Sequence, residues 1–528
     1  MALKVVSDID VKGKAVILRA GLDVPLDVTK DLLDPERVTD DTRIRDIMPT
    51  LRYLIKHSAR IILAGGWCGR PNGEDAVYSV APVAKRLEFI LKKEGLLRHP
   101  VLLAPDCFSD RKPRSVNKNR NEVLQIVQKA KEGQVVYLEN VRFDPEANAN
   151  DRDFASFIAS LGDIYINENE TQNHRPEATI STTPLLIASK GGEVGYGFKY
   201  AEVLRHIGGL KASVENQKRG PFVLALSGKK IETDPGITSK ITVALGLLDS
   251  MRKGDTLLVG GAVSYTFILA KNFSSALGAN KAQINSTVEK YNKEIAEKTK
   301  QEKAESILNS LQAQKSKVLK ELLKITDEKI RSIIGNSYIR WGQEGEQIAF
   351  AYDVMCKCEQ KGVALATLTD HVITDKAPNK SGILPDDAKV KQFGQESGIP
   401  PGWLGVSMGK KSLAEFQKII SNSALYLQSG PFSIEDERVE KCIPADIGTF
   451  HSAKQAKEKG GITIAAGGDT VTRVNSLHAD SCFSIITSAG GATLELIRDG
   501  FSAGSKAIEE SQKISESLHA GKKRTKNA

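Results

Sequence analysis

Cysteine, long apolar runs and aromatic residues are all scarce in this chain. It has six cysteines in 528 residues, and aromatic residues make up 6% of the composition. So few cysteines do not form a disulfide framework, which indicates a reducing compartment and a cytoplasmic location. No apolar run has the length of a bilayer span, so we expect no membrane contact. The basic residues behind the net charge of +9 are dispersed, and aromatic stacking platforms are missing, so we expect no nucleic-acid partner.

A Walker lysine motif is also absent, although two segments have the pattern of a phosphate-binding loop. Residues 464–470 (Ile-Ala-Ala-Gly-Gly-Asp-Thr) and 487–495 (Thr-Ser-Ala-Gly-Gly-Ala-Thr-Leu-Glu) each end an apolar run with a glycine turn. A helical pattern follows each turn, so the turn exposes backbone N–H groups at a helix N-terminus, where phosphate binds. Asp469 adds a carboxylate where a nucleotide-bound Mg²⁺ would sit. The two loops predict a nucleotide enzyme outside the P-loop class.

Short apolar runs alternate with helical patterns along most of the chain. This alternation is typical of α/β domains with parallel, doubly wound sheets, whose ligands bind beyond the carboxyl ends of the strands. We expect two such domains, residues 1–199 and 217–499, joined by a helix over 200–216. The predicted strands are residues 14–19, 59–64, 101–104, 135–138, 164–167, 222–226, 256–259, 363–366, 424–427, 462–465 and 483–486.

Residues 278–340 interrupt the second series of strands. The segment is rich in Lys, Glu, Gln and Ala, contains no proline, and has apolar residues at helical spacing. It predicts a helical hairpin or long helices inserted into the second domain, with Leu311, Val318 and Leu322 buried. Two roles stay open for this insertion: packing on its own domain, or docking a protein partner. Residues 516–528 form a basic tail.

An ordered set of motifs covers nearly the whole chain outside the insertion and the tail. The set comprises residues 11–14 (Val-Lys-Gly-Lys), 40–44 (Asp-Asp-Thr-Arg-Ile), 69–73 (Gly-Arg-Pro-Asn-Gly), 138–143 (Leu-Glu-Asn-Val-Arg-Phe), 174–175 (His-Arg), 260–261 (Gly-Gly), 398–400 (Gly-Ile-Pro), 467–470 (Gly-Gly-Asp-Thr) and 490–492 (Gly-Gly-Ala). In these motifs the chain resembles the phosphoglycerate kinase family. The resemblance implies two Rossmann-like domains joined by a hinge helix, with residues 500–515 packed back on the first. It also implies reversible phosphoryl transfer between 1,3-bisphosphoglycerate and Mg-ADP in glycolysis.

The resemblance assigns 3-phosphoglycerate to the first domain. The residues that match the family's acceptor site are Asp23, Arg43, Arg70, Arg142 and Arg175. Arginine forks suit phosphate and carboxylate oxygens, and all four arginines follow predicted strands.

The resemblance assigns ATP or ADP, with Mg²⁺, to the second domain. Lys230 matches the lysine that neutralises the transferring phosphoryl group, and Asp469 matches the metal ligand. Glu435 or Asp436 matches the carboxylate that holds the ribose, and the loop length leaves this choice open. The implied catalytic set is Lys230, Arg43, Gly490 and Gly491. The other implied nucleotide-binding residues are Gly228, Lys240, Gly260, Gly261, Pro400, Gly430, Pro431, Gly467, Gly468 and Thr470.

Several positions depart from the family pattern. Gly21 and Asp23 stand where the family has Asp and Asn, so we expect weak acceptor binding: Gly21 offers no hydrogen bond and Asp23 repels an anion. Residues 167–173 (Asn-Glu-Asn-Glu-Thr-Gln-Asn) replace the family's Asn-Asp-Ala-Phe-Gly-Thr-Ala, which adds acidic residues to the acceptor site. Ala466 and Ala489 replace the leading glycine of each phosphate loop, where a methyl group would crowd the phosphate.

These departures leave two functions open. The retained arginines, Lys230 and Asp469 favour a phosphoglycerate kinase, at full or attenuated rate, because charge neutralisation is the largest contribution to phosphoryl transfer. The substitutions fit instead a catalytically impaired protein that binds nucleotide and acts through its helical insertion, because a fold does not guarantee an activity.

Overall fold

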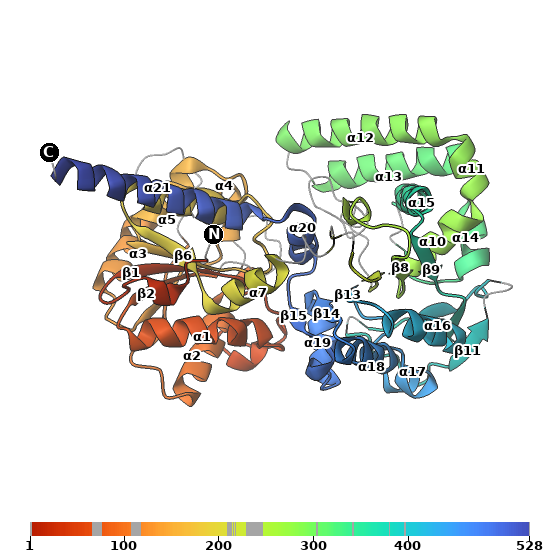
Figure 1. Ribbon diagram of the computed structural model, residues 1–528, viewed down its shortest axis with the longest axis horizontal. Helices are drawn as coiled ribbons and strands as arrows, with labels where there is room; N and C mark the ends of the chain where they lie inside the picture. The colour runs from red at the N-terminus through yellow and green to blue at the C-terminus, as the bar shows by residue number, and fades with distance from the viewer. Residues whose placement is uncertain are drawn as a thin grey trace. The chain divides into compact units, whose positions relative to one another are not determined.

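The chain folds into two compact units (Figure 1). The computed structural model describes residues 3–65, 76–106, 118–208, 214, 216, 218–228, 246–301, 305–339, 343–379, 381–394 and 398–526. Unit 1 comprises Met1–Gly209 and Asp499–Ala528, and unit 2 comprises Leu210–Arg498. Each unit contains a six-stranded parallel sheet covered by helices, so the predicted α/β class is confirmed.

The sheet of unit 1 has the strand order β3-β4-β2-β1-β5-β6. Its strands are β1 (Ala15–Ala20), β2 (Arg60–Ala64), β3 (Leu102–Leu103), β4 (Val135–Tyr137), β5 (Ile164–Glu168) and β6 (Glu193–Tyr196). All six residues of β1 are buried, and its register with β5 places Ala20 beside Glu168. Only β6 is missing from the prediction, because its four residues, Glu-Val-Gly-Tyr, are too short and contain a glycine in place of an apolar run.

The helices of unit 1 include one that comes from the far end of the chain. They are α1 (Thr42–Lys56), α2 (Ala81–Lys93), α3 (Lys118–Lys129), α4 (Pro145–Asn148), α5 (Arg152–Ser160), α6 (Thr183–Ser189), α7 (Phe198–Gly208) and α21 (Ala503–Lys526). α1 begins at Thr42, which places Arg43 in its first turn. α21 lies along unit 1, where Gln512 Nε2 donates to the carbonyl oxygen of Val194 at 3.3 Å (Figure 1).

The parallel sheet of unit 2 has the order β15-β14-β13-β7-β8-β9. Its strands, all of them predicted, are β7 (Phe222–Leu226), β8 (Thr256–Val259), β9 (Ala364–Thr367), β13 (Leu425–Ser429), β14 (Ile462–Ala466) and β15 (Ile485–Thr487). A second, antiparallel sheet of order β11-β10-β12 was not predicted. Its strands are β10 (Asp370–Thr374), β11 (Val390–Gly394) and β12 (Leu404–Met408). β11 and β12 lack the apolar run typical of a buried strand, because β11 has largely exposed polar residues and β12 contains a glycine.

The helices of unit 2 fall into two groups. The insertion and its flanks supply α10 (Val263–Asn272), α11 (Ser274–Ala279), α12 (Lys281–Gln301), α13 (Glu305–Leu323), α14 (Asp327–Ile334) and α15 (Glu344–Lys361). The later strands alternate with α16 (Lys410–Ile420), α17 (Glu437–Cys442), α18 (Ala445–Glu458), α19 (Gly468–Ser476) and α20 (Gly491–Asp499). In the described residues, no helix combines the length and apolar composition that a membrane span needs.

The helical insertion packs against its own unit. α12 and α13 lie side by side, and α13 also contacts α15 (Figure 1). Of the predicted stripe on α13, Leu311 is buried and Leu322 is half-buried, whereas Val318 is 37% exposed, so the prediction is wrong at Val318. Leu319 and Leu323 of the same helix are also buried. Lys315 lies on the same face, where its Nζ pairs with Glu346 Oε2 of α15 at 2.6 Å. The apolar stripe is therefore buried largely within unit 2.

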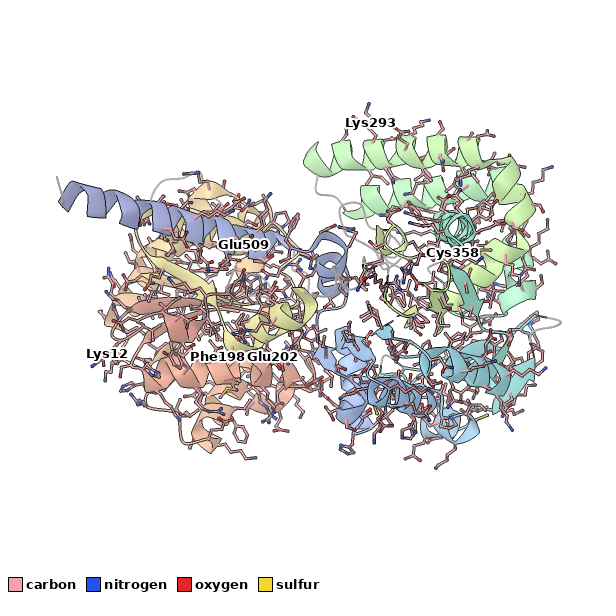
Figure 2. All side chains as sticks on the ribbon, viewed as in Figure 1. Lys12, Phe198, Glu202, Lys293, Cys358 and Glu509 are labelled. Atoms are coloured by element: carbon pink, nitrogen blue, oxygen red, sulfur yellow. The ribbon has the colours of Figure 1, made fainter. Side chains whose placement is uncertain are left out.

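Two closely spaced cysteines, Cys356 and Cys358, lie on one helix, α15. Both are free thiols, and burial raises the pKa of the Cys358 thiol to about 11 (Figure 2). A thiol held in its neutral form is a poor nucleophile and a poor metal ligand. Lys293 of α12, in contrast, points outward to solvent (Figure 2).

Candidate nucleotide and acceptor sites

Glycine-containing turns of unit 2 meet at the carboxyl edge of its parallel sheet. A Cβ atom on Gly467, after β14, would lie 3.4 Å from the Cα of Gly490, after β15. A Cβ atom on Gly430, after β13, would lie 2.0 Å from the carbonyl oxygen of Ser227, after β7. One on Gly261, after β8, would lie 2.7 Å from the backbone nitrogen of Gly228. Space thus excludes a side chain at Gly430 and Gly261, and the backbones of these turns lie close together.

The turn after β14 has the features of a phosphate-binding site. Gly467 has φ of +100°, a conformation that glycine adopts without strain, and no side chain caps the helix α19 that follows. The first N–H groups of α19 are therefore available to an anion, which the helix dipole also favours. Asp469 is exposed in the first turn of α19, and within the described part of the chain no side chain pairs with its carboxylate. This arrangement fits a phosphate group and its divalent cation.

Thr470 joins two of these turns. Its hydroxyl accepts a hydrogen bond from the backbone N–H of Gly430 at 2.8 Å and donates to the carbonyl oxygen of Ala466 at 2.8 Å. Ala466 and Ala489 are both buried, with exposed fractions of 0% and 3%. Their methyl groups therefore pack inside unit 2 and do not face solvent.

A buried ionic network lies behind the same turns. Asp446 of α18 accepts a hydrogen bond from the backbone N–H of Phe432 at 2.7 Å and another from Arg473 Nε of α19 at 2.9 Å. Arg473 also pairs with Glu440. Burial raises the pKa of Glu440 to about 7, and the Arg473 guanidinium opposes this rise. One carboxylate thus fixes both the turn after Pro431 and the helix that starts at Gly468.

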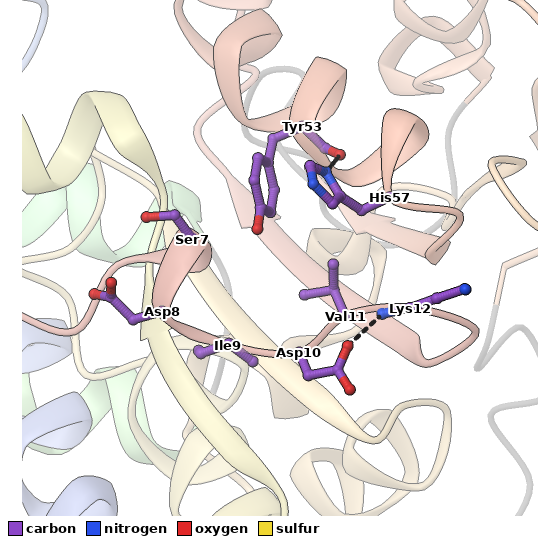
Figure 3. Close-up of a pocket in the computed structure, with 8 residues that line it drawn as sticks. All are labelled: Ser7, Asp8, Ile9, Asp10, Val11, Lys12, Tyr53 and His57. Atoms are coloured by element: carbon purple, nitrogen blue, oxygen red, sulfur yellow. Dashed lines mark hydrogen bonds between the residues drawn. The ribbon is translucent and has the colours of Figure 1, made fainter.

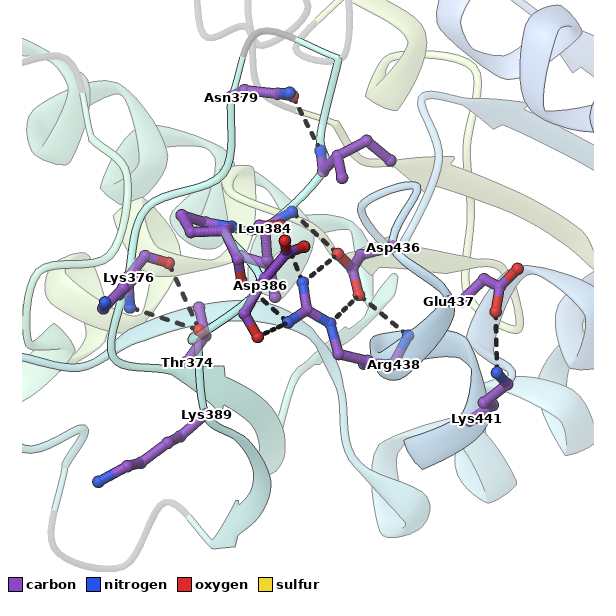
Figure 4. Close-up of polar contacts among 12 residues, drawn as sticks. Thr374, Lys376, Asn379, Leu384, Asp386, Lys389, Asp436, Glu437, Arg438 and Lys441 are labelled. Carbon is purple, nitrogen blue, oxygen red and sulfur yellow. Dashed lines mark hydrogen bonds and ion pairs between the residues drawn. The ribbon is translucent and has the colours of Figure 1, made fainter.

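The two carboxylates proposed for the ribose have different surroundings in the structure (Figure 4). Asp436 is 3% exposed, and its oxygens accept hydrogen bonds from the backbone N–H of Leu384 and from the backbone and guanidinium of Arg438 at 2.9–3.0 Å. Arg438 in turn donates to the carbonyl oxygens of Leu384, Pro385 and Asp386. Asp436 therefore holds a loop together, and its hydrogen bonds lower its pKa to about 2. Glu435 is exposed, so it is the better candidate for a ligand contact.

Pro400 lies in the turn before β12, on the side of unit 2 that contains α10. A Cβ atom on Gly405 of β12 would lie 1.7 Å from the hydroxyl oxygen of Tyr265 on α10, so this strand and helix pack tightly. Gly260 and Gly261 precede α10. A Cβ atom on Gly260 would lie 2.3 Å from the ring of Phe432.

Arg43 and Asp23 of unit 1 lie together. Arg43 Nη1 donates to the backbone carbonyl of Asp23 and lies 3.6 Å from its carboxylate. The negative charge of Asp23 is thus partly neutralised by Arg43.

Three arginines surround the buried carboxylate of Glu177. Burial raises the pKa of Glu177, while the guanidinium groups of Arg19, Arg142 and Arg175 oppose that rise. Arg19 is fully buried in β1 and lies 3.6 Å from Glu177. Arg142 and Arg175, on the loops after β4 and β5, are only partly buried. The two predicted arginines therefore share one electrostatic environment, and Arg19 is a third member that the sequence reading missed.

Glu168 does not point toward these arginines. Its carboxylate accepts hydrogen bonds from the hydroxyl of Thr50 at 2.7 Å and from the backbone N–H groups of Lys199 and Tyr200 at 3.1 Å. The acid thus caps the first turn of α7. Burial raises the pKa of Glu168 to about 7. Three predicted site residues, Arg70, Lys230 and Lys240, lie outside the described residues.

A surface pocket of about 290 Å³ lies elsewhere on unit 1 (Figure 3). It is lined by the N-terminal segment Ser7–Lys12 and by Tyr53 and His57 in and just after the last turn of α1. Because α1 follows β1 and leads back to β2, its last turn lies near the amino edge of the parallel sheet, opposite to Arg43. The pocket is therefore separate from the arginine site.

Comparisons with known proteins show the family of the chain. A family model described as phosphoglycerate kinase matches residues 6–333 and 326–499. The chain belongs to the phosphoglycerate kinase family. Phosphoglycerate kinase 1, chloroplastic, of Arabidopsis thaliana is 31% identical over 516 residues, covering 97% of this chain and 83% of that protein. The cytosolic phosphoglycerate kinase of Triticum aestivum is 30% identical over 507 residues, covering 95% of this chain and 96% of that protein.

Solved phosphoglycerate kinase structures share the fold. The enzyme from Pyrococcus horikoshii OT3 aligns with a TM-score of 0.61 and 17% identity over 97% of this chain and 100% of that one. The enzyme from Coxiella burnetii aligns with a TM-score of 0.59 and 20% identity over 96% of this chain and 99% of that one. Family membership makes the chain a phosphotransferase of glycolysis that uses a small-molecule substrate and ATP or ADP. The alternative of a catalytically impaired nucleotide-binding protein has no support from these comparisons.

Proposed function

We propose that the chain transfers a phosphoryl group reversibly between 1,3-bisphosphoglycerate and Mg-ADP, with the nucleotide at the glycine turns of unit 2. The convergence of these turns around the uncapped N-terminus of α19 is the observation that carries the proposal. Gly467, Gly468 and Gly490 would present backbone N–H groups to phosphate oxygens, and Asp469 would bind the Mg²⁺. The cation would draw charge from the phosphates, as in other phosphoryl-transfer enzymes.

The remaining residues of unit 2 would orient the nucleotide. Glu435 would accept hydrogen bonds from the ribose, while Asp436 holds the loop beside it. Gly260, Gly261 and Pro400 would form the adenine side. The other proposed contacts in this unit are Gly228, Lys240, Gly430, Pro431, Thr470 and Gly491.

In unit 1, arginine side chains would bind 3-phosphoglycerate. Arg43 is held by Asp23, and Arg142 and Arg175 lie near Glu177, so their guanidinium groups are positioned before the ligand binds. Such preorganised positive charge stabilises the additional negative charge of the transition state. Arg70 would complete the set, and Lys230 would neutralise the transferring phosphoryl group.

The decisive test is a coupled assay of the purified protein with 3-phosphoglycerate and Mg-ATP. Lys230→Ala should lower turnover about 100-fold or more with little change in nucleotide affinity, because a group that acts on transition-state charge affects kcat. Lys229→Ala is the matched control and should keep most of the activity. Asp469→Ala should weaken magnesium-dependent ADP binding in calorimetry. An inactive parent protein, or equal ADP affinity of Asp469→Ala and parent, would contradict the proposal.

Two further proposals concern the cellular location of the enzyme and a protein partner. A cytoplasmic location is supported by a relative named cytosolic, whereas other relatives are named chloroplastic. A protein partner at residues 278–340 would have to use the charged outer surface of the insertion, because its apolar residues Leu311, Leu319 and Leu323 are buried.

A further inference from the structure

Gly21 packs directly against two polar side chains of the loop after β5. A Cβ atom on Gly21 would lie 2.7 Å from both Asn169 Oδ1 and Thr171 Oγ1. Real Cβ atoms do not approach oxygens so closely. Gly21 does not have a positive φ, so its backbone conformation is open to any residue. Space, and not backbone strain, therefore disfavours a side chain at position 21, because Asn169 or Thr171 would have to move.

The substitutions at these three positions are reciprocal. The family pattern has Asp at position 21, Ala at 169 and Gly at 171, whereas this chain has a small residue at 21 and larger ones at 169 and 171. The strand register pairs Ala20 with Glu168, which brings the two loops side by side. The polar atoms of Asn169 and Thr171 thus occupy the space into which a side chain at 21 would extend.

Asn169 has an unsatisfied buried donor. The residue is fully buried, and its Oδ1 accepts a hydrogen bond from the backbone N–H of Gln172 at 3.2 Å. No described residue accepts a hydrogen bond from Asn169 Nδ2, and none pairs with the hydroxyl of Thr171, which is also shielded from solvent. A buried donor without an acceptor is unfavourable, and a bound ligand that accepts its hydrogen bond removes that cost.

These donors lie beside the arginine site. The loop after β1 that contains Gly21 also contains Asp23, the partner of Arg43, and the loop with Asn169 and Thr171 also contains Arg175. Gln172, next to Thr171, accepts a hydrogen bond from the buried Arg19 at 3.2 Å. Both loops follow adjacent strands at the carboxyl edge of the sheet, where ligands of such folds bind.

We propose that Asn169 and Thr171 are specificity-determining residues of the acceptor site. They replace the side chain at position 21 and donate hydrogen bonds to an oxygen of the three-carbon acid. The inference rests on the proposed phosphoglycerate kinase function. A neutral amide and a hydroxyl donate to an anionic ligand, whereas an ionised aspartate at position 21 only accepts. Gly21 therefore does not imply a lost site, because the hydrogen bonds come from the neighbouring loop.

Kinetics of the full-length protein test the donor role. Asn169→Ala and Thr171→Ala should each raise the KM for 3-phosphoglycerate about 5- to 30-fold, with kcat and the KM for Mg-ATP little changed, as expected for a lost hydrogen bond to a charged ligand. Thr171→Ser keeps the hydroxyl and should have the same KM for 3-phosphoglycerate as the parent. Asn169→Asp replaces the amide donor by a carboxylate of the same shape, which only accepts hydrogen bonds. This variant should bind 3-phosphoglycerate more weakly than Asn169→Ala does.

A stability cycle tests the packing separately from catalysis. Gly21→Ala should lower the melting temperature in the parent, but should have little effect in the Asn169→Ala/Thr171→Gly background, where the space is free. Adding Gly21→Asp to that background should recover acceptor affinity. Equal effects of Gly21→Ala in both backgrounds, or an unchanged acceptor KM in Asn169→Ala and Thr171→Ala of an active enzyme, would overturn the inference. An inactive parent would overturn the proposed function, while the stability cycle would still decide the packing.

Discussion

Thr470 and Gly430 join the turns after two adjacent strands through a single hydrogen bond of 2.8 Å between the Thr470 hydroxyl and the Gly430 N–H. Gly430 has φ of +103°, and a Cβ atom there would lie 2.0 Å from the carbonyl oxygen of Ser227. Gly430 is thus confined between the chain at Ser227 and the hydroxyl of Thr470. The geometry of the proposed phosphate site depends on this contact.

We predict that Thr470→Val raises the KM for Mg-ATP about 5- to 20-fold and lowers the melting temperature. Removing the hydroxyl leaves the buried N–H of Gly430 without its acceptor, which costs about 1–3 kcal/mol. Steady-state kinetics with varied Mg-ATP measure the effect. Thr470→Ser keeps the hydroxyl and is the matched control. Equal KM values for the two variants would show that the hydrogen bond does not position the turn.

The buried pair of Asp446 and Arg473 should contribute strongly to stability. Arg473→Met leaves the carboxylate of Asp446, which is 0% exposed, without its cation, and we expect a loss of about 3–5 kcal/mol in the free energy of unfolding. Urea unfolding of the parent and the variant measures it. The double variant Asp446→Asn/Arg473→Met should recover part of the loss, because the fully buried carboxylate of Asp446 is removed together with its cation.

A surface pair provides the control for that experiment. Lys441 and Glu437 lie 2.8 Å apart on α17, with side chains 75% and 84% exposed. Lys441→Ala should change the free energy of unfolding little, because water screens exposed pairs. A loss in Arg473→Met as small as that in Lys441→Ala would contradict the role assigned to the buried network.

Most of the fold follows from local patterns in the sequence, and the exceptions have physical causes. Runs such as Phe222–Leu226 are apolar throughout because both faces of a parallel strand are buried. β11, with residues Val-Lys-Gln-Phe-Gly, has no such run, because it is an edge strand with largely exposed side chains.

The candidate sites likewise contain some features that local sequence patterns predict and others that they do not. Gly467 and Gly490 were predicted because a glycine turn before a helix is a local signal. The contact of Gly21 with Asn169 and Thr171 was not, because it depends on the pairing of two strands that are far apart in the sequence. The pairing of Asp23 with Arg43 was missed for the same reason: a single residue does not reveal its partner across a loop.

Glu435 and Asp436 should have different functions despite being adjacent. Glu435→Gln should raise the KM for Mg-ATP several-fold with an unchanged melting temperature, because an exposed carboxylate that binds ribose makes few contacts in the free protein. Asp436→Asn should lower the melting temperature, because the charged acceptor for Arg438 and for the N–H of Leu384 is lost. Kinetics and thermal unfolding of both variants give the comparison. A reversed pattern would make Asp436 the ribose ligand.

The Asp436 variant also has an expected pH signature. The folded-state pKa of Asp436, about 2, is below its ordinary value. The stability that it contributes is therefore present above about pH 4 and is lost as the pH falls toward 2. The difference in melting temperature between parent and Asp436→Asn should narrow over this range.

Asp46 should make stability depend on pH in the opposite sense. It lies one turn after Arg43 on α1, where burial and the nearby Glu170 raise its pKa to about 7, while Lys199 and Arg43 oppose the rise. The folded state therefore favours the protonated acid. The associated stability is complete below about pH 4 and is lost as the pH rises through 7. Asp46→Asn should not show this loss, so its melting temperature should exceed that of the parent by more at pH 8 than at pH 5.

The same titration should affect acceptor binding. Ionised Asp46 places a negative charge near Arg43, so the affinity of the parent for 3-phosphoglycerate should fall, relative to Asp46→Asn, between pH 6 and pH 8. Calorimetry of both proteins at pH 6, 7 and 8 measures the ratio of the two dissociation constants, in which the titration of the ligand itself cancels. Asp31→Asn removes an exposed charge from unit 1 and should give a ratio that does not change with pH. If the ratio for Asp46→Asn were equally constant, the titration of Asp46 would have no influence on the arginine site.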